Sequence, residues 1–374
     1  MPMHVPTLQE LTDGQWEVQD LPISGNYLVT GGPGSGKTSI AIRRTQAIKK
    51  DNPEANVQTF LFTNTLNDFF SDSIKQVEQE GKKKVKIKSN INVWAKWQVG
   101  FLRQHNDWPY AFGEKVPNEV WSTLSAKILG HNLDSIIGHL IIDEAQDFTE
   151  TDLEVMGLIA DDITVFADPN QLLNQRGVED LDTIRSILSI DEDDSYHLKE
   201  NHRNTKEIMS AAKSFAPDEI DFDINEMEKT GWPKPRIKSF QNIDDEIGYI
   251  SRIIRANRQK DIGILHLENK VIYRMHKQLS EYNDGEINFE LKKKNTFDFT
   301  NTNPKLCTLD SAKGLEFDIV IMPQMTRESY YDRRINKKRI YVGMTRAREE
   351  LHMTYYGYPT VFLSQINPDT VDKG

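Results

Sequence analysis

Two segments of the chain carry residue types suited to chemistry on a phosphate group. The first, Gly31–Thr38, has the spacing G-x-x-x-x-G-K-T, in which glycines let backbone N–H groups turn around phosphate oxygens. The apolar run Tyr27–Thr30 precedes it and a helical pattern beginning at Ser39 follows, so a helix N-terminus adds partial positive charge. Lys37 would reach the β- and γ-phosphates, and the Thr38 hydroxyl would bind Mg²⁺. The spacing predicts a nucleoside triphosphate site.

The second segment, Ile141–Asp147, is an apolar strand pattern that ends in two adjacent acids. Because such a strand delivers both carboxylates to one edge of a sheet, Asp143 would hold Mg²⁺ through its water shell. Glu144 would polarise an attacking water as the general base. ATP and Mg²⁺ are therefore the predicted nucleotide and metal.

The elements that must position these residues predict an α/β fold with mainly parallel sheets, because apolar runs of strand length alternate with helical patterns. The expected strands are 27–30, 59–63, 139–142 and 163–167 in the first half, and 261–266, 306–309, 319–323 and 351–355 in the second. Arg339–Leu351 by itself predicts an apolar strand that runs into a charged helix.

An acidic run, Asp191–Asp194, predicts a flexible hinge near Tyr196. We therefore expect a first, ATP-binding lobe at residues 1–190, with a small insert around 66–135. The second lobe is expected at residues 191–374. A length of 374 residues fits two domains, at about 150 residues each.

Composition narrows the class of protein. A net charge of −11 and a pI near 5.4 exclude a wholly basic nucleic-acid coat protein, but they are compatible with a local basic groove. No apolar run approaches the length of about 18 residues that a membrane helix needs. The N-terminus lacks the regions of a signal peptide. The single cysteine, Cys307, excludes an internal disulfide and a cysteine-cluster metal site, and a cytoplasmic location is expected.

Further motifs place the chain beside a known family. Asp143–Asp147, Glu200–Arg203, Lys313–Asp318 and Tyr341–Arg348 occur in the order and style of the UvrD/Rep-like superfamily 1 helicases, and the resemblance extends from Gln15 to about Ile366. It implies two RecA-like lobes, each a mainly parallel sheet flanked by helices, with ATP in the cleft between them. It also implies ATP-driven movement on single-stranded DNA, favoured over RNA, in the 3′→5′ direction.

The resemblance also implies roles for individual residues. Gln15 would read the adenine edge, and His202 stands where a tyrosine commonly stacks on adenine. Gln171 would sense the γ-phosphate. Arg203 and Arg346 would be the arginines that the second lobe directs at that phosphate, since a guanidinium binds phosphate oxygens bidentately.

The remaining implied positions complete the nucleotide site. Glu316 would contact the nucleotide and Gly314 would let the backbone approach it closely. Asp168 would support the Mg²⁺ side, whereas Arg348 would be an ion-pair partner. The other nucleotide-binding positions form the phosphate loop, namely Gly34, Ser35, Gly36, Lys37, Thr38 and Ser39, and Thr38 and Asp143 are the expected metal ligands.

Several positions depart from the family pattern. Asp310 replaces a histidine in a motif that contacts nucleic acid, where an acid would repel phosphate. The segment Leu172–Gly177 lacks the family's base-stacking aromatics, and such stacking contributes about 1–3 kcal/mol per base. Trp94 and Trp97 either compensate for this loss or pack in the core. Thr63–Asn67 resembles a divergent strand-contacting motif.

Two functions stay open at this point. The first is a minimal translocase or helicase core, which lacks the large inserted subdomains on which strand separation in the family depends. The second is an ATP-driven switch or sensor subunit that binds DNA ends or a partner protein, such as a nuclease, in a repair or phage-defence complex. A plain P-loop kinase would leave Gln171, Arg203 and Lys313–Asp318 without roles.

Overall fold

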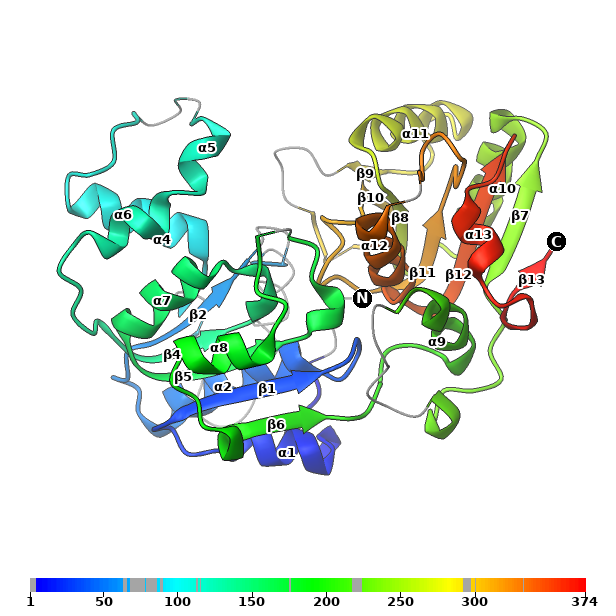
Figure 1. Ribbon diagram of the computed structural model, residues 1–374. Coiled ribbons are helices and arrows are strands. Elements are labelled where there is room, and N and C mark those ends of the chain that lie inside the picture. The colour runs from blue at the N-terminus through cyan, green and yellow to red at the C-terminus, as the bar shows by residue number, and fades with distance from the viewer. Residues whose placement is uncertain are drawn as a thin grey trace.

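A computed structural model of the chain describes residues 5–62, 66–67, 78, 86–87, 90–111, 114, 116–174, 176–216, 224–291, 297–299, 301–331 and 333–374. The chain forms two lobes side by side, each a parallel sheet flanked by helices (Figure 1). This is the predicted α/β, RecA-like arrangement. Among these residues no helix is long and apolar enough to cross a membrane.

The sheet of the first lobe has the order β3-β2-β4-β5-β1-β6. Its strands are β1 (Asn26–Gly31), β2 (Val57–Leu61), β3 (Ile91–Val93), β4 (Ile137–Ile142), β5 (Ala160–Ala167) and β6 (Ser195–Leu198). The helices of this lobe are α1 (Asp13–Gln19), α2 (Lys37–Asp51), α4 (Trp94–Gln104), α5 (Asn118–Trp121), α6 (Leu124–Leu129), α7 (Glu150–Ile159) and α8 (Leu181–Ile187).

The sheet of the second lobe has the order β13-β7-β12-β11-β8-β10-β9. Its strands are β7 (Arg236–Phe240), β8 (Ile262–His266), β9 (Glu290–Leu291), β10 (Lys305–Thr308), β11 (Phe317–Met322), β12 (Ala347–Tyr356) and β13 (Asp372–Lys373). The helices are α9 (Lys206–Ala212), α10 (Ile243–Ala256), α11 (Asn269–Tyr282), α12 (Arg334–Met344) and α13 (Val361–Gln365).

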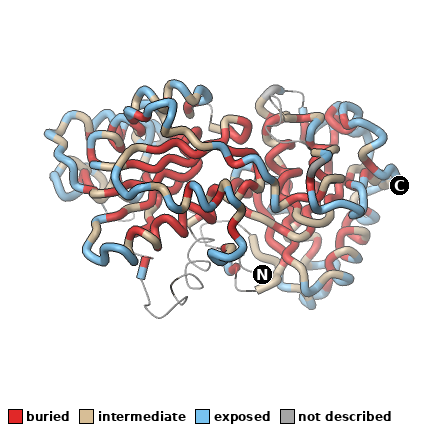
Figure 2. The backbone as a smooth tube through the Cα atoms, turned by 90° about the horizontal axis from the view of Figure 1, so that it is seen from below, coloured by how far each residue is buried: buried red, intermediate tan, exposed pale blue. Residues whose placement is uncertain are grey.

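The central strands of both sheets lie in the core. Figure 2 shows that the residues along these strands are buried. β4 and β11 are near-continuous apolar runs because helices cover both faces of each sheet. Each of the eight expected strands corresponds to an observed strand. Cys307 is buried in β10.

Two predictions about the chain's layout need correction. β6 pairs in parallel with β1, so the first sheet extends to Leu198 and the lobe boundary falls after that residue, not at residue 190. The acidic run is a short 3-10 turn that leads into β6 and does not separate the lobes.

The segment Arg339–Leu351 has the reverse of the predicted order, because its apolar part ends helix α12 and its charged part begins strand β12. The apolar residues that end α12 are buried. Because no polar residues alternate with them, the sequence shows no helical period in this segment. The charges of β12 are held by ion pairs, including Arg348 with Asp318 at 2.8 Å.

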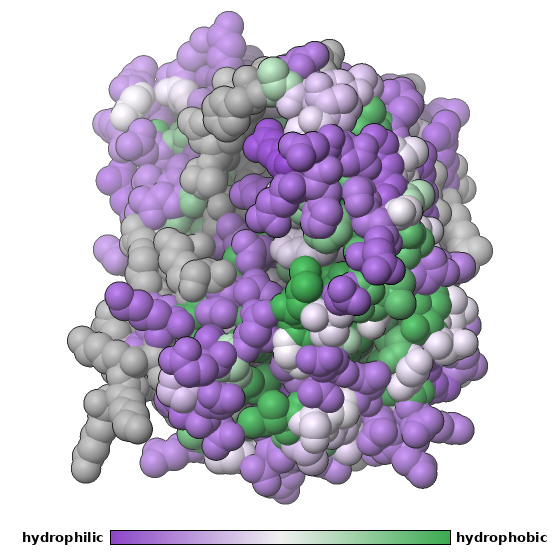
Figure 3. Space-filling model, turned by 90° about the vertical axis from the view of Figure 1, so that its left-hand side faces the viewer, coloured by the Kyte–Doolittle hydropathy of each residue, from purple (hydrophilic) through white to green (hydrophobic). Residues whose placement is uncertain are grey.

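The insert of the first lobe contributes α4, α5 and α6 at the outer end of that lobe (Figure 1). Figure 3 views this end, where hydrophobic side chains gather among hydrophilic ones. Trp94 is buried and its ring stacks on Trp97 with centroids 4.9 Å apart, while its Nε1–H donates to Asp152. The suggestion that Trp94 compensates for missing base-stacking residues is therefore wrong, because its ring is occupied inside the core.

Candidate functional site

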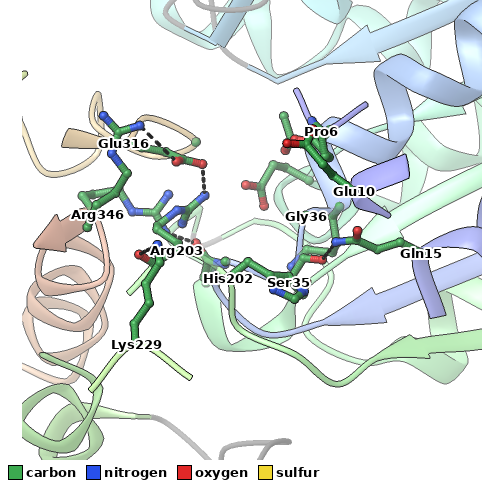
Figure 4. Close-up of a pocket in the computed structure, with 18 residues that line it drawn as sticks. Pro6, Glu10, Gln15, Ser35, Gly36, His202, Arg203, Lys229, Glu316 and Arg346 are labelled. Carbon is green, nitrogen blue, oxygen red and sulfur yellow. Dashed lines mark hydrogen bonds and ion pairs between the residues drawn. The ribbon is translucent and has the colours of Figure 1, made fainter. Parts of the chain in front are cut away.

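A cavity of about 370 Å³ lies where the two lobes meet. Figure 4 shows Arg203, Glu316 and Arg346 on one side of it, facing Gln15, Ser35 and Gly36 on the other. The residues that line it are Pro6, Glu10, Gln15, Gly34, Ser35, Gly36, Lys37, Thr38, Ser39, Glu144, Gln171, His202, Arg203, Lys229, Gly314, Glu316, Arg346 and Arg348. The structure thus brings together every predicted nucleotide and catalytic position except Asp143 and Asp168, which are buried and contact the lining residues Thr38 and Lys37, respectively.

The phosphate loop connects β1 to α2 in a conformation that requires glycine. Gly34 and Gly36 have φ angles of 78° and 90°, a backbone region that side chains strain. A Cβ on Gly36 would lie 2.5 Å from Nε2 of Gln15, which itself donates to the Ser35 carbonyl at 3.0 Å. The first hydrogen bond of α2 runs from Ile40 N–H to the Gly36 carbonyl. The first turn of an α-helix leaves N–H groups without intrahelical partners, so those of Lys37 and Thr38, which line the cavity, can bind an anion there.

Lys37 supplies positive charge at the base of the loop. Its Nζ donates to the carbonyls of Gly31 and Gly32 at 2.5 and 3.0 Å, and it lies 3.6 Å from Oδ2 of Asp168. The ammonium is therefore held at the end of β1, beside the acids at the ends of the neighbouring strands.

The two adjacent acids after β4 have different environments. Asp143 is fully buried and accepts a hydrogen bond from the Thr38 hydroxyl at 2.8 Å. Burial, together with the charge of Glu144, raises the pKa of Asp143 to about 7. Burial also disfavours the Glu144 carboxylate, but Lys313, Lys37 and a hydrogen bond from Gln146 outweigh it and lower the pKa of Glu144. Environments that separate two pKa values in this way suit carboxylates with different roles.

The Thr38–Asp143 pair fits a bound Mg²⁺. A hydroxyl and a buried carboxylate are hard oxygen ligands, and here their oxygens are 2.8 Å apart. Mg²⁺ prefers oxygen ligands and usually keeps several waters, so that it binds one or two protein groups plus phosphates. No cluster of three or more metal-ligating His, Cys, Asp or Glu residues occurs in the described part of the chain.

The opposite side of the cavity holds arginines from beyond β6. Arg346 donates to Oε1 of Gln171 at 2.6 Å, and Gln171 donates in turn to Asp168 at 2.6 Å. Arg203 donates to Oε1 of Glu316 at 2.8 Å. Burial and the nearby Arg203 lower the pKa of Arg346 to about 9. An anion in the cavity would offset both of these effects on the pKa of Arg346, because it would attract two guanidinium groups that otherwise repel each other.

Three buried polar atoms at the cavity lack hydrogen-bond partners within the described residues, namely Nε of Arg203, Nε of Arg348 and Oγ of Ser35. Such atoms are costly to bury unless a ligand or water satisfies them. All three atoms belong to residues that line the cavity, so a ligand with oxygen acceptors would reduce this cost.

The segment between β6 and α9 crosses from one lobe to the other and carries His202 and Arg203. His202 N–H donates to the Gly34 carbonyl at 3.0 Å, which ties the segment to the phosphate loop. The Asn204 side chain donates to the carbonyls of Thr345 and Ala347 at 3.0 and 2.6 Å, which ties it to the turn between α12 and β12 that carries Arg346.

The positions that depart from the family pattern are also accounted for. Asp310 forms a two-bond ion pair with Arg339, at 2.6 and 2.9 Å, so its charge is compensated. Leu172 and Leu173 are both buried. Arg348 is an ion-pair partner of Asp318, as predicted. Most of Thr63–Asn67 lies outside the described residues.

Sequence reasoning missed Lys313 and Lys229 as functional candidates. Lys313 Nζ contacts Asp147 at 2.6 Å and Glu144 at 3.5 Å across the lobe boundary. Lys229 lines the cavity and donates to the carbonyl of Arg203 at 3.0 Å. The only indication in the sequence was the position of Lys313 within the Lys313–Asp318 motif. That motif is expected to contact nucleic acid, so it did not point to a role beside Glu144.

The comparisons with known proteins agree with this arrangement. The family described as Schlafen group 3, DNA/RNA helicase domain, matches residues 24–222, which is more than half of the chain. The chain therefore belongs to this helicase family. Two UvrD-like helicase C-terminal domain families match residues 196–303 and 306–354, and they confirm the predicted resemblance to UvrD-like helicases. Membership implies a nucleic-acid helicase that uses ATP with a divalent metal.

None of the curated proteins compared with the chain matches it. One matching solved structure is the C-terminal domain of a possible DNA helicase from Lactobacillus plantarum WCFS1. It is 19% identical, and the match covers 46% of this chain and 97% of that one with a TM-score of 0.37. A likeness at this level carries no argument, so the fold rests on the strand pairing described above.

The acid pair leads to a prediction about stability. Because the pKa of Asp143 is raised in the folded state, the native protein keeps a proton that the unfolded chain loses, and its stability falls as pH rises from about 4 to about 7. In the Asp143→Asn variant this fall in stability with pH is absent, because asparagine does not ionise. In the presence of a chelator we expect the variant to gain about 2 kcal/mol relative to wild type between about pH 5 and about pH 8.

Urea unfolding at both pH values measures this difference, and Asp134→Asn, at an exposed carboxylate, is the matched control. Mg²⁺ should stabilise wild type at the higher pH and leave Asp143→Asn unchanged. Equal differences between variant and wild type at both pH values would contradict the raised pKa.

Proposed function

We propose that the chain is an ATP-hydrolysing motor that moves on single-stranded DNA, a minimal translocase or helicase core. One observation carries this proposal: a single cavity takes its phosphate loop and Glu144 from the first lobe and Glu316 and Arg346 from the second. A ligand that contacts both lobes favours their closed arrangement, and its hydrolysis removes that preference. ATP turnover is thereby converted into relative movement of the lobes.

In the proposed hydrolysis, Glu144 accepts a proton from a water molecule whose oxygen forms a bond to the γ-phosphorus. The bond between that phosphorus and the β–γ bridging oxygen breaks, and ADP and phosphate are the products. Lys37, Arg203 and Arg346 stabilise the negative charge on the transferring phosphoryl oxygens. Thr38 and Asp143 would hold Mg²⁺, which neutralises phosphate charge when bound.

Binding and sensing of the nucleotide fall to the remaining cavity residues. Gln15 donates to the Ser35 carbonyl and the His202 N–H donates to the Gly34 carbonyl, and we propose that these two side chains bind the adenine base. Gln171 links Asp168 to Arg346, so a γ-phosphate that displaces Arg346 from its oxygen acceptor also disturbs the turn after β5. We propose this contact as the γ-phosphate sensor. Gly314 and Glu316 complete the site from the second lobe.

The strand bound by the motor is proposed to be DNA in preference to RNA, with movement in the 3′→5′ direction. This choice rests on the UvrD-like resemblance. A competition assay in which RNA of the same length and sequence displaces labelled DNA tests the preference, and equal displacement by both would remove it.

A second function is an ATP-driven switch or sensor subunit that binds DNA ends, or a partner protein such as a nuclease, without travelling. The segment after Gln171 favours this alternative, because Leu172 and Leu173 pack inward where the family has base-stacking aromatics. The lost stacking, about 1–3 kcal/mol per base, would weaken stepping more than it would weaken binding at an end.

The two functions differ in how ATPase activity depends on strand length. For a translocase we expect the steady-state rate to climb as single-stranded DNA is lengthened and then to level off, because each binding event supports more steps on a longer strand. For a sensor, short oligonucleotides should saturate the rate. The measurement uses low and moderate salt, because phosphate contacts weaken with salt. Glu144→Gln serves as the blank.

A further inference from the structure

One buried lysine joins the two lobes directly beneath the cavity. Lys313 lies between β10 and β11 in the second lobe, and only 4% of its surface is exposed. Its Nζ donates to Oδ2 of Asp147 at 2.6 Å and lies 3.5 Å from Oε2 of Glu144. Both acids belong to the turn after β4 in the first lobe. The ammonium therefore crosses the lobe boundary to reach the proposed general base.

This contact fixes which oxygen of Glu144 faces a reacting water. Oε2 already accepts a hydrogen bond from Gln146 at 2.6 Å and also faces the Lys313 ammonium. Oε1 is therefore the oxygen left for a water in the cavity. Gln146 is itself fixed, since its Oε1 accepts the Asp168 N–H at 2.9 Å. One side of the carboxylate is thus held by the first lobe and by a charge from the second.

The charge of Lys313 is stable where it lies. Burial alone would deprotonate it, but Asp147 and Glu144 outweigh burial and raise the pKa of Lys313 above its usual value. Removing one partner of such a buried pair leaves the other charge uncompensated. If the lobes separated, the ammonium would leave with the second lobe, and Glu144 and Asp147 would remain together without it.

We propose that Lys313 is a positioning residue that makes Glu144 an effective base only while the two lobes are closed. The inference rests on the proposed ATPase function and deepens it. An open cleft leaves the carboxylate without its orienting cation, so bound ATP is protected from hydrolysis until closure. Opening after hydrolysis then resets the site.

The test compares Lys313→Met with the matched control Lys338→Met. Lys338 also crosses the lobes, to Glu179, but lies outside the cavity. For Lys313→Met we expect kcat to fall about 10- to 100-fold, less than the about 10²–10⁴-fold that a general base contributes. The affinity for a fluorescent non-hydrolysable ATP analogue should stay within about threefold.

Further variants separate positioning from folding. In a Glu144→Gln background Lys313→Met should cause no additional loss of kcat, because both residues act through the same carboxylate. The inference is overturned if Lys313→Met keeps the wild-type kcat, if Lys338→Met reproduces its effects, or if Lys313→Met lowers kcat further in the Glu144→Gln background. A wild-type protein without ATPase activity overturns the proposed function itself, and this inference with it.

Discussion

Arg346→Lys is expected to lower the DNA-stimulated ATPase kcat by about 10³–10⁵-fold, the range that arginine fingers contribute elsewhere. The guanidinium of Arg346 is buried and donates to Oε1 of Gln171 at 2.6 Å, on the side of the cavity that faces the phosphate loop. Lysine keeps the positive charge but cannot bind two phosphate oxygens in one plane. The loss should therefore appear in kcat, with a small change in nucleotide affinity.

Single-turnover hydrolysis and equilibrium binding of a fluorescent ATP analogue measure the two quantities separately. Arg255→Lys is a suitable control, because Arg255 also lies in the second lobe and bonds Asn283 and Glu286 outside the cavity. Thermal unfolding of both variants checks that the fold is kept. A variant of Arg346 that hydrolyses ATP at the wild-type rate would remove this residue from the proposed transition state.

Glu144→Gln is expected to lower kcat by about 10²–10⁴-fold, the usual contribution of a general base. The substitution is nearly isosteric and leaves Lys313 its bond to Asp147 at 2.6 Å. It also removes a negative charge from the cavity, so nucleotide affinity should be equal to or higher than that of wild type. The variant should accordingly accumulate in the ATP-bound state.

The measurement is the fraction of radiolabelled ATP still intact on the protein after rapid filtration. Glu154→Gln, on the exposed side of α7, changes the net charge equally and should match wild type. If Glu144→Gln releases ADP as fast as wild type, the water must be activated by another group.

The central strands could be predicted from the sequence because they are buried on both faces. β4 and β11 are nearly continuous apolar runs, and such runs are typical of strands that are buried on both faces of a parallel sheet. The strands that were missed are short or lie near sheet edges. Ile237 is the one buried residue of β7, and both residues of β13 are exposed, so neither strand carries a strong apolar signal.

The phosphate loop and the acid pair could be predicted because the residues of each motif lie close together in the sequence. The partner of Lys313 could not be predicted, because Asp147 is 166 residues away and belongs to the other lobe. The same limit applies to Asp310. In the sequence, Asp310 is an acid in a motif that contacts nucleic acid. In the structure, Arg339 of helix α12 forms an ion pair with it. Pairings of this kind depend on how two elements pack together.

The crossing segment between Leu198 and α9 has a mechanical consequence. Its ends are tied to the two lobes, by His202 N–H to Gly34 and by the Asn204 side chain to Thr345 and Ala347, and Arg203 lies between them at the cavity. The proposed γ-phosphate site is thus placed at the fulcrum of a lever whose arms are the lobes. A rotation driven there by a sub-ångström change at the phosphate grows in proportion to the distance from the axis. The length of the lobes, more than the size of the nucleotide, would then set the stroke.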